Sequence, residues 1–320
     1  MFKSLCPVLT LFVILNTSCV ENIITIQVYP DGQTYLKIVS LGDSTDIHDN
    51  DFIHPLQSQI TNNSSFNILK KDSLWEATTE LIYKDSIFNF NPKTSLGFNF
   101  YRLEQKTGLS ISYSFKMEFI GRVLKKNYPL LYIALQNNNL DSLEWLPEAM
   151  TIIIDNSLID IKNGNLNIKN KFDKKRLVNH FKNAFARITT FRELEHIQKN
   201  RLDFIKNTIK PFKLDEDFAT ELTKKMAIHE NHLKASLGLK DDSFTIKLLM
   251  PGEMSGTNAM SINQDTLIWK FGLDSLLNDN YILSANSVVY SKEKIQKTSI
   301  LIVCFLLIFG IILINKQKKL

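Results

Sequence analysis

The chain has 320 residues, 44% of them hydrophobic, with only three cysteines and a formal net charge of +5 at pH 7. The excess of positive charge lies outside residues 20–294. Within that range, the basic side chains balance the 33 acidic ones. Residues 20–299 contain no cysteine, which excludes a cysteine protease, a thiol oxidoreductase and a cysteine zinc site. A chain of this size buries about three quarters of its unfolded surface, so it can fold without disulfides.

The N-terminus has the pattern of a secretory signal peptide. Lys3 precedes an apolar run over residues 9–15, and the small or polar residues 16–18 then lead to Cys19. A basic start, a short apolar run and a small-residue cleavage site predict a signal peptide over residues 1–18. The position of Cys19 fits lipidation at a lipobox, although Asn16 stands where an aliphatic residue is usual. Ordinary cleavage or an uncleaved anchor are the alternatives.

The C-terminus predicts a membrane anchor. Residues 300–314 carry no charge, and a tail with three lysines follows. The length approaches the ~17–25 residues of a helix that crosses a bilayer, and the lysines fit the positive-inside rule. We therefore expect a single transmembrane helix over 295–315, a cytoplasmic tail over 316–320 and an extracytoplasmic domain over 19–294, at a bacterial inner membrane. A eukaryotic type I membrane protein is the alternative, because residues 62–65 hold two overlapping N-glycosylation patterns.

Charge is distributed unevenly within the domain. Residues 21–121 have a net charge of −4, residues 122–240 of +7, and residues 241–294 of −3. The basic middle could contact anionic lipid headgroups or an acidic partner, or its lysines could simply be solvated. Nucleic acid is not an expected partner in the predicted compartment.

The first part of the domain predicts strands. Residues 22–29 and 33–39 alternate between apolar and polar side chains, and Pro30-Asp31-Gly32 between them indicates a β-hairpin. Residues 43–65 lack periodicity and predict a long loop. The remaining strands expected here are 75–83, 96–104 and 109–119, the last two as a second hairpin.

The middle of the chain changes to a helical period, which defines a helical insert over about residues 140–240. Apolar side chains recur on one face within 177–188, 194–205 and 218–237. The third helix follows the acidic residues 215–217 and ends at Gly238. A shorter helix is expected at about 141–154.

Strands return after the insert, at 243–249, 266–271 and 281–290, with a break at Pro251-Gly252. The predicted fold class is therefore α+β. We expect an antiparallel sheet built from the N- and C-terminal strands, an inserted helical block and one C-terminal transmembrane helix.

Both ends of the domain carry a family resemblance. The residues that carry it are Cys19-Val20-Glu21, Pro30-Asp31-Gly32, Met250-Pro251-Gly252-Glu253, Asn258, Thr266-Leu267-Ile268-Trp269 and Leu283-Ser284-Ala285-Asn286-Ser287. In these motifs the chain resembles bacterial lipoproteins with an LppM-type domain, whereas the helical middle has no counterpart. The resemblance implies binding of an envelope lipid or glycolipid and supplies no catalytic residues.

Candidate chemistry is sparse, and no catalytic residue or cofactor is assigned. His229 and His232 lie three residues apart on a predicted helix, a spacing that can serve a metal but differs from the four-residue spacing of zincins. His229 also lies on the apolar stripe of that helix, which favours a buried or interface histidine. Trp269 and Phe271 could line an apolar ligand groove, and core packing is the alternative for both.

These patterns predict a non-enzymatic envelope protein that binds a lipid or glycolipid close to the membrane. One alternative is a structural scaffold whose helical insert docks an envelope protein. Another is a metal-dependent hydrolase that uses His229 and His232.

Overall fold

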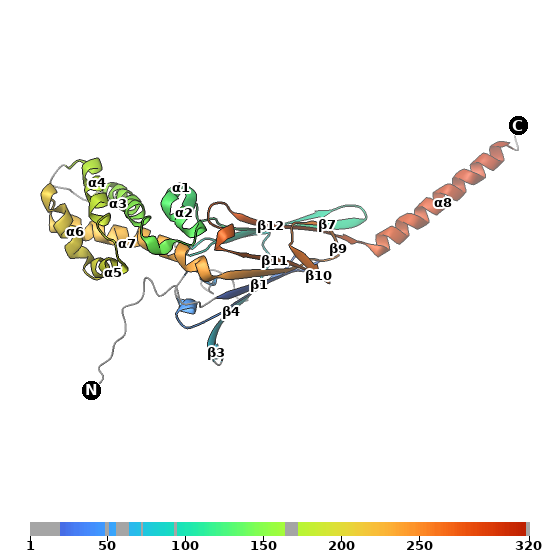
Figure 1. The fold of residues 1–320 in the computed structure, drawn as a ribbon. Coiled ribbons are helices and arrows are strands. Elements are labelled where there is room, and N and C mark those ends of the chain that lie inside the picture. The colour runs from blue at the N-terminus through green and yellow to red at the C-terminus, as the bar shows by residue number, and fades with distance from the viewer. Residues whose placement is uncertain are drawn as a thin grey trace.

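The computed structural model describes residues 20–48, 51–55, 64–71, 73–92, 95–163 and 172–317. The fold is α+β, with two packed β-sheets and a block of helices at one end (Figure 1). The predicted signal peptide and Cys19 lie outside the described residues.

The larger sheet has seven strands in the order β10-β11-β8-β1-β2-β4-β3. Its strands are β1 (Glu21–Val28), β2 (Thr34–Gly42), β3 (Ser64–Lys71), β4 (Leu74–Tyr83), β8 (Ser243–Leu249), β10 (Ser261–Asn263) and β11 (Thr266–Gly272). The hairpin predicted at the N-terminus is confirmed as β1 and β2, which pair from Glu21 with Leu41 to Val28 with Thr34. Gly32 in their turn has a φ of 86°, a conformation that glycine adopts without strain.

The smaller sheet has five strands in the order β5-β6-β7-β12-β9. Its strands are β5 (Ile87–Phe90), β6 (Phe98–Lys106), β7 (Ser110–Phe119), β9 (Glu253–Thr257) and β12 (Tyr281–Tyr290). The predicted second hairpin is confirmed as β6 and β7, which pair from Phe98 with Phe119 to Lys106 with Ile111.

Aromatic side chains join the two sheets face to face into a sandwich. Phe119 of β7 lies 4.9 Å from Phe271 of β11 and 6.1 Å from Phe244 of β8, between ring centroids. Tyr83 of β4 lies 4.8 Å from Phe100 of β6. Alternating burial along the strands places these rings inside, as expected for half-buried strands.

The single antiparallel sheet expected from the sequence is thus wrong in two respects. The strands divide between two sheets, and β1 pairs with β8 in parallel, from Glu21 with Ser243 to Gln27 with Leu249. Parallel neighbours need a long crossover connection. Here the crossover contains β2 to β7 and the helical block.

The helical block between β7 and β8 runs from Leu124 to Gly238, and we call it the helical head. It starts earlier than predicted, and the helix expected at 141–154 lies later, at α3. Its helices are α1 (Leu124–Asn127), α2 (Pro129–Gln136), α3 (Leu146–Asn163), α4 (Lys174–Phe185), α5 (Phe191–Lys199), α6 (Arg201–Ile209) and α7 (Glu216–Gly238).

Local sequence signals define the helix ends in the head. Asp173 and Asp215 cap α4 and α7 by accepting hydrogen bonds from backbone N–H groups in the first turn. Thr190 and Glu193 form a capping box at the start of α5. These caps satisfy donors that the helices cannot satisfy themselves.

Helix α7 connects the head to the sandwich, and Arg122 fixes it there. The Arg122 side chain donates to Ser236 Oγ (2.8 Å) and to the carbonyl oxygens of His232 and Ser95 (both 3.3 Å). The bonds tie the segment after β7 to α7. Burial lowers the pKa of Arg122, and Asp51 acts in the opposite direction.

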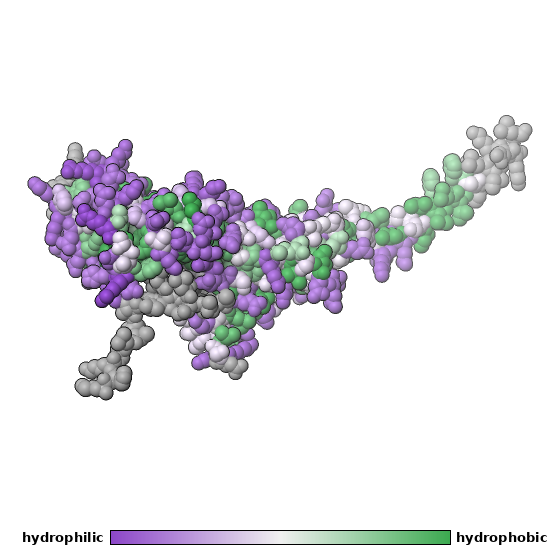
Figure 2. All heavy atoms as spheres, viewed as in Figure 1, coloured by the Kyte–Doolittle hydropathy of each residue, from purple (hydrophilic) through white to green (hydrophobic). Residues whose placement is uncertain are grey.

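The last helix, α8 (Lys292–Gln317), projects from the end of the sandwich opposite the helical head (Figure 1). Within the described part of the chain, no helix combines the length and the apolar character needed to cross a membrane. The predicted transmembrane helix over 295–315 is therefore wrong. Charged residues occupy the first turns of α8, where Lys292, Glu293, Lys294 and Lys297 lie. Figure 2 shows this change from hydrophilic to hydrophobic side chains along α8.

Candidate functional site

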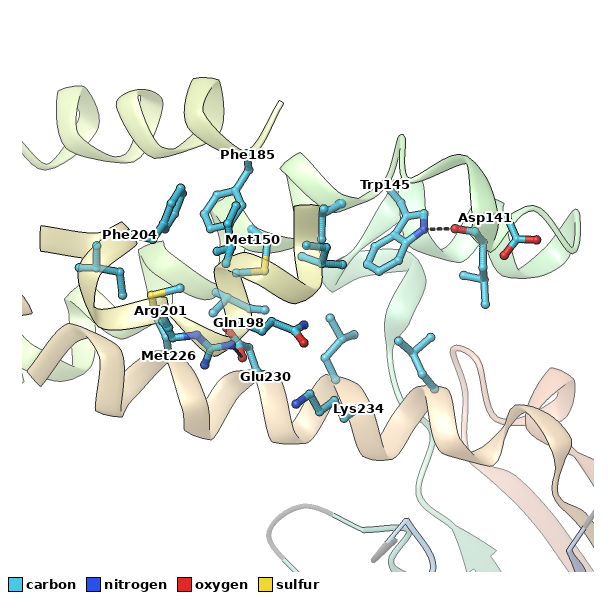
Figure 3. Close-up of a pocket in the computed structure, with 18 of the residues that line it drawn as sticks. Asp141, Trp145, Met150, Phe185, Gln198, Arg201, Phe204, Met226, Glu230 and Lys234 are labelled. Carbon is cyan, nitrogen blue, oxygen red and sulfur yellow. Dashed lines mark hydrogen bonds and ion pairs between the residues drawn. The ribbon is translucent and has the colours of Figure 1, made fainter. Parts of the chain in front are cut away.

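The helical head contains a partly open, mainly apolar cavity of ≈ 100 Å³ (Figure 3). Helices α3, α5, α6 and α7 supply most of its walls, and Phe185 at the end of α4 closes one side. Trp145, Met150 and Met226 also line it, and all three are buried. A cavity with this lining is suited to an apolar group, because burial of apolar surface against it is favourable.

The wall contributed by α7 follows from its sequence period. Met226, Glu230, Leu233 and Leu237 recur at intervals of three or four residues and therefore lie on one face of the helix. Three members of this stripe are apolar, and Glu230 stands between them. The face that packs into the head thus carries one carboxyl group into the wall of the cavity.

Glu230 forms a buried ion pair with Arg201 at the start of α6. Arg201 Nη2 lies 2.5 Å from Glu230 Oε2, and the two side chains are 19% and 9% exposed. Figure 3 shows the pair beside the cavity, with Gln198 next to it. Arg201 is held in place by the ion pair, which orients the carboxyl group of Glu230.

The second carboxyl oxygen of Glu230 is left without a hydrogen bond. Oε1 is buried and has no hydrogen-bond partner within the described part of the chain. Burial raises the pKa of Glu230, outweighing the opposite effects of Arg201 and Lys234. A buried acceptor without a donor is costly, so this oxygen lowers the stability of the folded head.

Further polar groups line the same cavity. Gln198 and Lys234 flank the ion pair, and Asp141 lies at the other end of the cavity, beside Trp145 (Figure 3). Lys240, in the turn after α7, also lines the cavity. Trp145 is oriented by its indole N–H, which donates to the carbonyl oxygen of Leu140 at 2.9 Å. The cavity thus combines an apolar interior with a few fixed polar groups, the pattern of small-molecule binding sites.

Trp269 and Phe271, the residues predicted to line an apolar groove, lie in the core of the sandwich instead. Trp269 is 1% exposed and Phe271 is 8% exposed. Phe271 packs between Phe119 and Tyr281, at 4.9 and 4.2 Å between ring centroids. Both side chains therefore have a packing role in the described structure.

Three residues of the sequence resemblance meet around Asn258. Its Oδ1 accepts from the Trp269 indole N–H (3.0 Å) and from the backbone N–H of Ser284 (2.8 Å), and its Nδ2 donates to the carbonyl oxygen of Ile282 (2.8 Å). Trp269 belongs to the larger sheet and Ser284 to the smaller one. Asn258 thus ties the two sheets together, a structural role that requires no ligand.

The two candidate metal-binding histidines have other contacts. His229 Nε2 lies 2.9 Å from Asp160 Oδ2 on α3, and the His232 carbonyl accepts from Arg122. Burial lowers the pKa of His232, and the charges of Arg122 and His229 add to this effect. Among the described residues, no group of three or more histidine, cysteine or acidic side chains is placed to hold a metal ion.

A second polar cluster lies buried in the sandwich, where Ser40 and His54 have the geometry of a nucleophile and its base. Ser40 Oγ lies 2.8 Å from His54 Nε2, and His54 Nδ1 lies 3.0 Å from Thr79 Oγ1. Asn22 joins the chain of hydrogen bonds at its other end. Its Nδ2 donates to Asp242 Oδ2 at 3.0 Å, and its Oδ1 accepts from Ser40.

The direction of these hydrogen bonds argues against a nucleophilic Ser40. Because the Asp242 carboxylate accepts from Asn22, the amide oxygen of Asn22 faces Ser40 and takes its hydroxyl proton. Ser40 must then accept from His54 Nε2–H, and Thr79 donates to Nδ1. A base that activates serine must present its lone pair to the hydroxyl, which is the opposite arrangement. The cluster is therefore best explained as a satisfied structural network.

Comparison with protein-family models, with curated proteins and with solved structures gives no match. The resemblance to LppM-type lipoproteins consequently stays a prediction, and the cavity must be interpreted from its own chemistry.

The sequence analysis predicted neither the cavity nor its ion pair, and it singled out His229 and His232, on either side of Glu230, instead. A sequence signal for a buried ion pair was nonetheless present. An acidic residue in the middle of an apolar stripe, at the position of Glu230, is rarely buried unless it is paired. Arg201 lay outside that pattern, since only the packing of α6 against α7 brings it to Glu230.

Proposed function

We propose that the chain is a non-enzymatic binding module whose helical head holds one apolar chain of a lipid or glycolipid. The observation that carries this proposal is the ≈ 100 Å³ apolar cavity within the head. The volume is of the same order as that of an apolar cavity of about 150 Å³ that binds benzene. It therefore has room for part of a single apolar chain, and a complete two-chain lipid does not fit.

The proposed setting is the bacterial envelope, with the domain outside the cytoplasm and Cys19 as a lipid anchor. Membrane lipids would then be the source of the ligand. The basic character of residues 122–240, at +7, supports an approach of the head to anionic headgroups.

A protein-interaction scaffold is the second candidate, and α8 favours it. Large apolar side chains on this helix are exposed, among them Leu301 at 69% and Phe305 at 70%. Exposed apolar surface of this kind marks an interaction site. Recovery of one stoichiometric partner protein that depends on α8 would favour this function.

The test of ligand binding is calorimetric titration of the purified full chain with 1-decanol. At about 0.8 kcal/mol per buried methylene, burial of about five to nine methylenes contributes about 4–7 kcal/mol, so we expect a dissociation constant between about 10 µM and 1 mM. Met150→Phe should weaken binding at least about tenfold by placing a ring in the cavity.

Met117→Phe is the matched control, because Met117 is also buried but lies on β7 in the sandwich, away from the cavity. This variant should bind 1-decanol like the unmodified chain. Absence of saturable binding to the unmodified chain, or equal binding by the Met150→Phe variant, would refute the proposal.

A further inference from the structure

The outer surface of the helical head carries a run of positive charge. Residues 174–192, which form α4 and the start of α5, contain six basic side chains and no acidic one. Lys174 pairs with Asp155 at 2.8 Å, whereas the other five are exposed and form no ion pair with an acidic side chain of the described residues. These five, which we call the basic strip, are Lys175, Arg176, Lys182, Arg187 and Arg192. Exposed cations that no ion pair neutralises attract a partner with many negative charges.

The helical period places the strip on the solvent side of α4. Lys175 and Lys182 are two turns apart, so they lie on the same side of the helix. The buried side chains of α4, among them Leu177 and Phe181, lie on the opposite side. Helices α4 and α5 both belong to the end of the molecule that lies farthest from α8 (Figure 1). The strip is therefore accessible to a large surface.

An open groove continues the strip where α4 meets α5. Its lining joins basic side chains, such as Arg187 and Arg192, to apolar ones, such as Ile188 and Ile197. Glu193 also lines the groove, but its carboxyl group already accepts hydrogen bonds from backbone N–H groups just before α5. A lining of this composition matches an anionic lipid surface, which offers negative charge next to apolar groups.

The groove lies on the outer side of the cavity wall. Ile197 of α5 lines both the groove and the cavity, so this helix separates the two. A bilayer that contacted the groove would lie against the wall of the cavity, which is proposed to take its ligand from membrane lipids. An acidic protein or a nucleic acid would meet the same charges without supplying an apolar ligand.

We propose that the basic strip docks the helical head on an anionic bilayer, with α4 and the start of α5 facing the lipid headgroups. The partner is a surface of negatively charged phospholipids, recognised through their phosphate groups. This inference rests on the proposed function, because it specifies the face through which the head reaches the source of the ligand.

The experiment measures sedimentation of the purified full chain with vesicles of pure phosphatidylcholine, and with vesicles in which about a third of the lipid is phosphatidylglycerol. The neutral vesicles report any binding through the exposed apolar side chains of α8, which needs no charge. Each basic side chain near an anionic surface strengthens binding about fivefold. We therefore expect at least about hundredfold tighter binding to the anionic vesicles at about 0.1 M salt, and loss of this preference at about 1 M.

A triple variant tests whether the strip is the docking surface. Lys182→Gln with Arg187→Gln and Arg192→Gln removes three of its charges, and none of these residues lines the cavity. We expect the variant to bind the anionic vesicles about a hundredfold more weakly than the unmodified chain, close to its binding to neutral vesicles.

The matched control removes the same number of charges from the sandwich. Lys70, Lys84 and Lys270 are exposed and lie in or next to strands of the larger sheet. Replacing all three by glutamine changes the net charge equally and should keep the preference for anionic vesicles.

The outcomes separate docking from ligand binding. Equal binding of the unmodified chain to both kinds of vesicle would overturn the docking inference, as would an equal loss in the control and strip variants. Binding to poly-glutamate without a preference for anionic vesicles would also overturn it, and would indicate an acidic protein partner. Calorimetry on the strip variant should still detect 1-decanol, because the cavity is intact. Failure of 1-decanol to bind the unmodified chain would instead refute the proposed function, whatever the vesicles show.

Discussion

Acidification should destabilise the sandwich through His54, whose hydrogen bonds require a neutral ring. His54 is 5% exposed and contacts Ser40 at 2.8 Å and Thr79 at 3.0 Å. Burial lowers its pKa from 6.5 to about 4. Protonation would add a second N–H to the ring and force Thr79 to give up its role as donor.

The sign and size of the effect follow from this pKa. In the unfolded chain His54 binds a proton near pH 6.5, whereas in the folded chain it does so only near pH 4. Between these values the unfolded state holds more protons, so the free energy of unfolding falls as the pH falls. At about 1.36 kcal/mol per pH unit, the full loss is about 3 kcal/mol, complete below pH 4.

The assay is urea unfolding of the full chain at pH 7.5 and pH 4, with His54→Gln as the comparison. Glutamine offers one donor to Ser40 and one acceptor to Thr79 and does not titrate. The unmodified chain should lose about 3 kcal/mol more than the variant between the two pH values. Equal losses, within about 0.5 kcal/mol, would refute the reasoning, because the carboxyl groups common to both chains would then explain the whole effect.

Three further predictions concern the helical head. Met150→Phe should leave the melting temperature unchanged or raise it, whereas Met117→Phe should cost about 1–3 kcal/mol by overpacking; thermal unfolding by circular dichroism compares them. Glu230→Met alone should cost about 3–5 kcal/mol in urea unfolding because Arg201 loses its buried partner, and adding Arg201→Met should recover most of that loss. Asp215→Ala should cost about 1 kcal/mol by removing the α7 cap, and an unchanged urea midpoint would show that the cap does not stabilise the domain.

Local signals predicted the local elements. The hairpin of β1 and β2 followed from strict alternation and from Asp31-Gly32 in its turn, and α7 followed from its acidic start and its apolar stripe. The strands near residues 243–249 and 281–290 were found in the same way. Each of these patterns is contained within about ten to twenty neighbouring residues, where periodicity is informative.

Non-local features could not be obtained this way. The parallel pairing of β1 with β8 joins residues more than two hundred positions apart. The alternation of apolar and polar side chains is the same in both sheets, so it does not show which strands are neighbours. The ion pair of Arg201 with Glu230 depends on how α6 packs against α7. The predicted groove at Trp269 was plausible from composition, but Asn258 and the packed sheets bury that side chain.

The membrane helix was predicted from the uncharged run over residues 300–314, with Thr298 and Ser299 included. In the structure this run belongs to a longer helix, α8, which begins with Lys292, Glu293 and Lys294. Among the described residues, no helix has the length and apolar character of a membrane span.

The most direct test of the central claim locates 1-decanol in the protein by NMR. In the full chain with ¹³C-labelled methionine methyl groups, Met150 and Met226 line the cavity, whereas Met117 lies in the sandwich and Met254 on β9. The account predicts intermolecular NOEs from 1-decanol to the methyl groups of Met150 and Met226 and none to those of Met117 and Met254. NOEs to Met254, or their absence at Met150 in a sample saturated with 1-decanol, would contradict it.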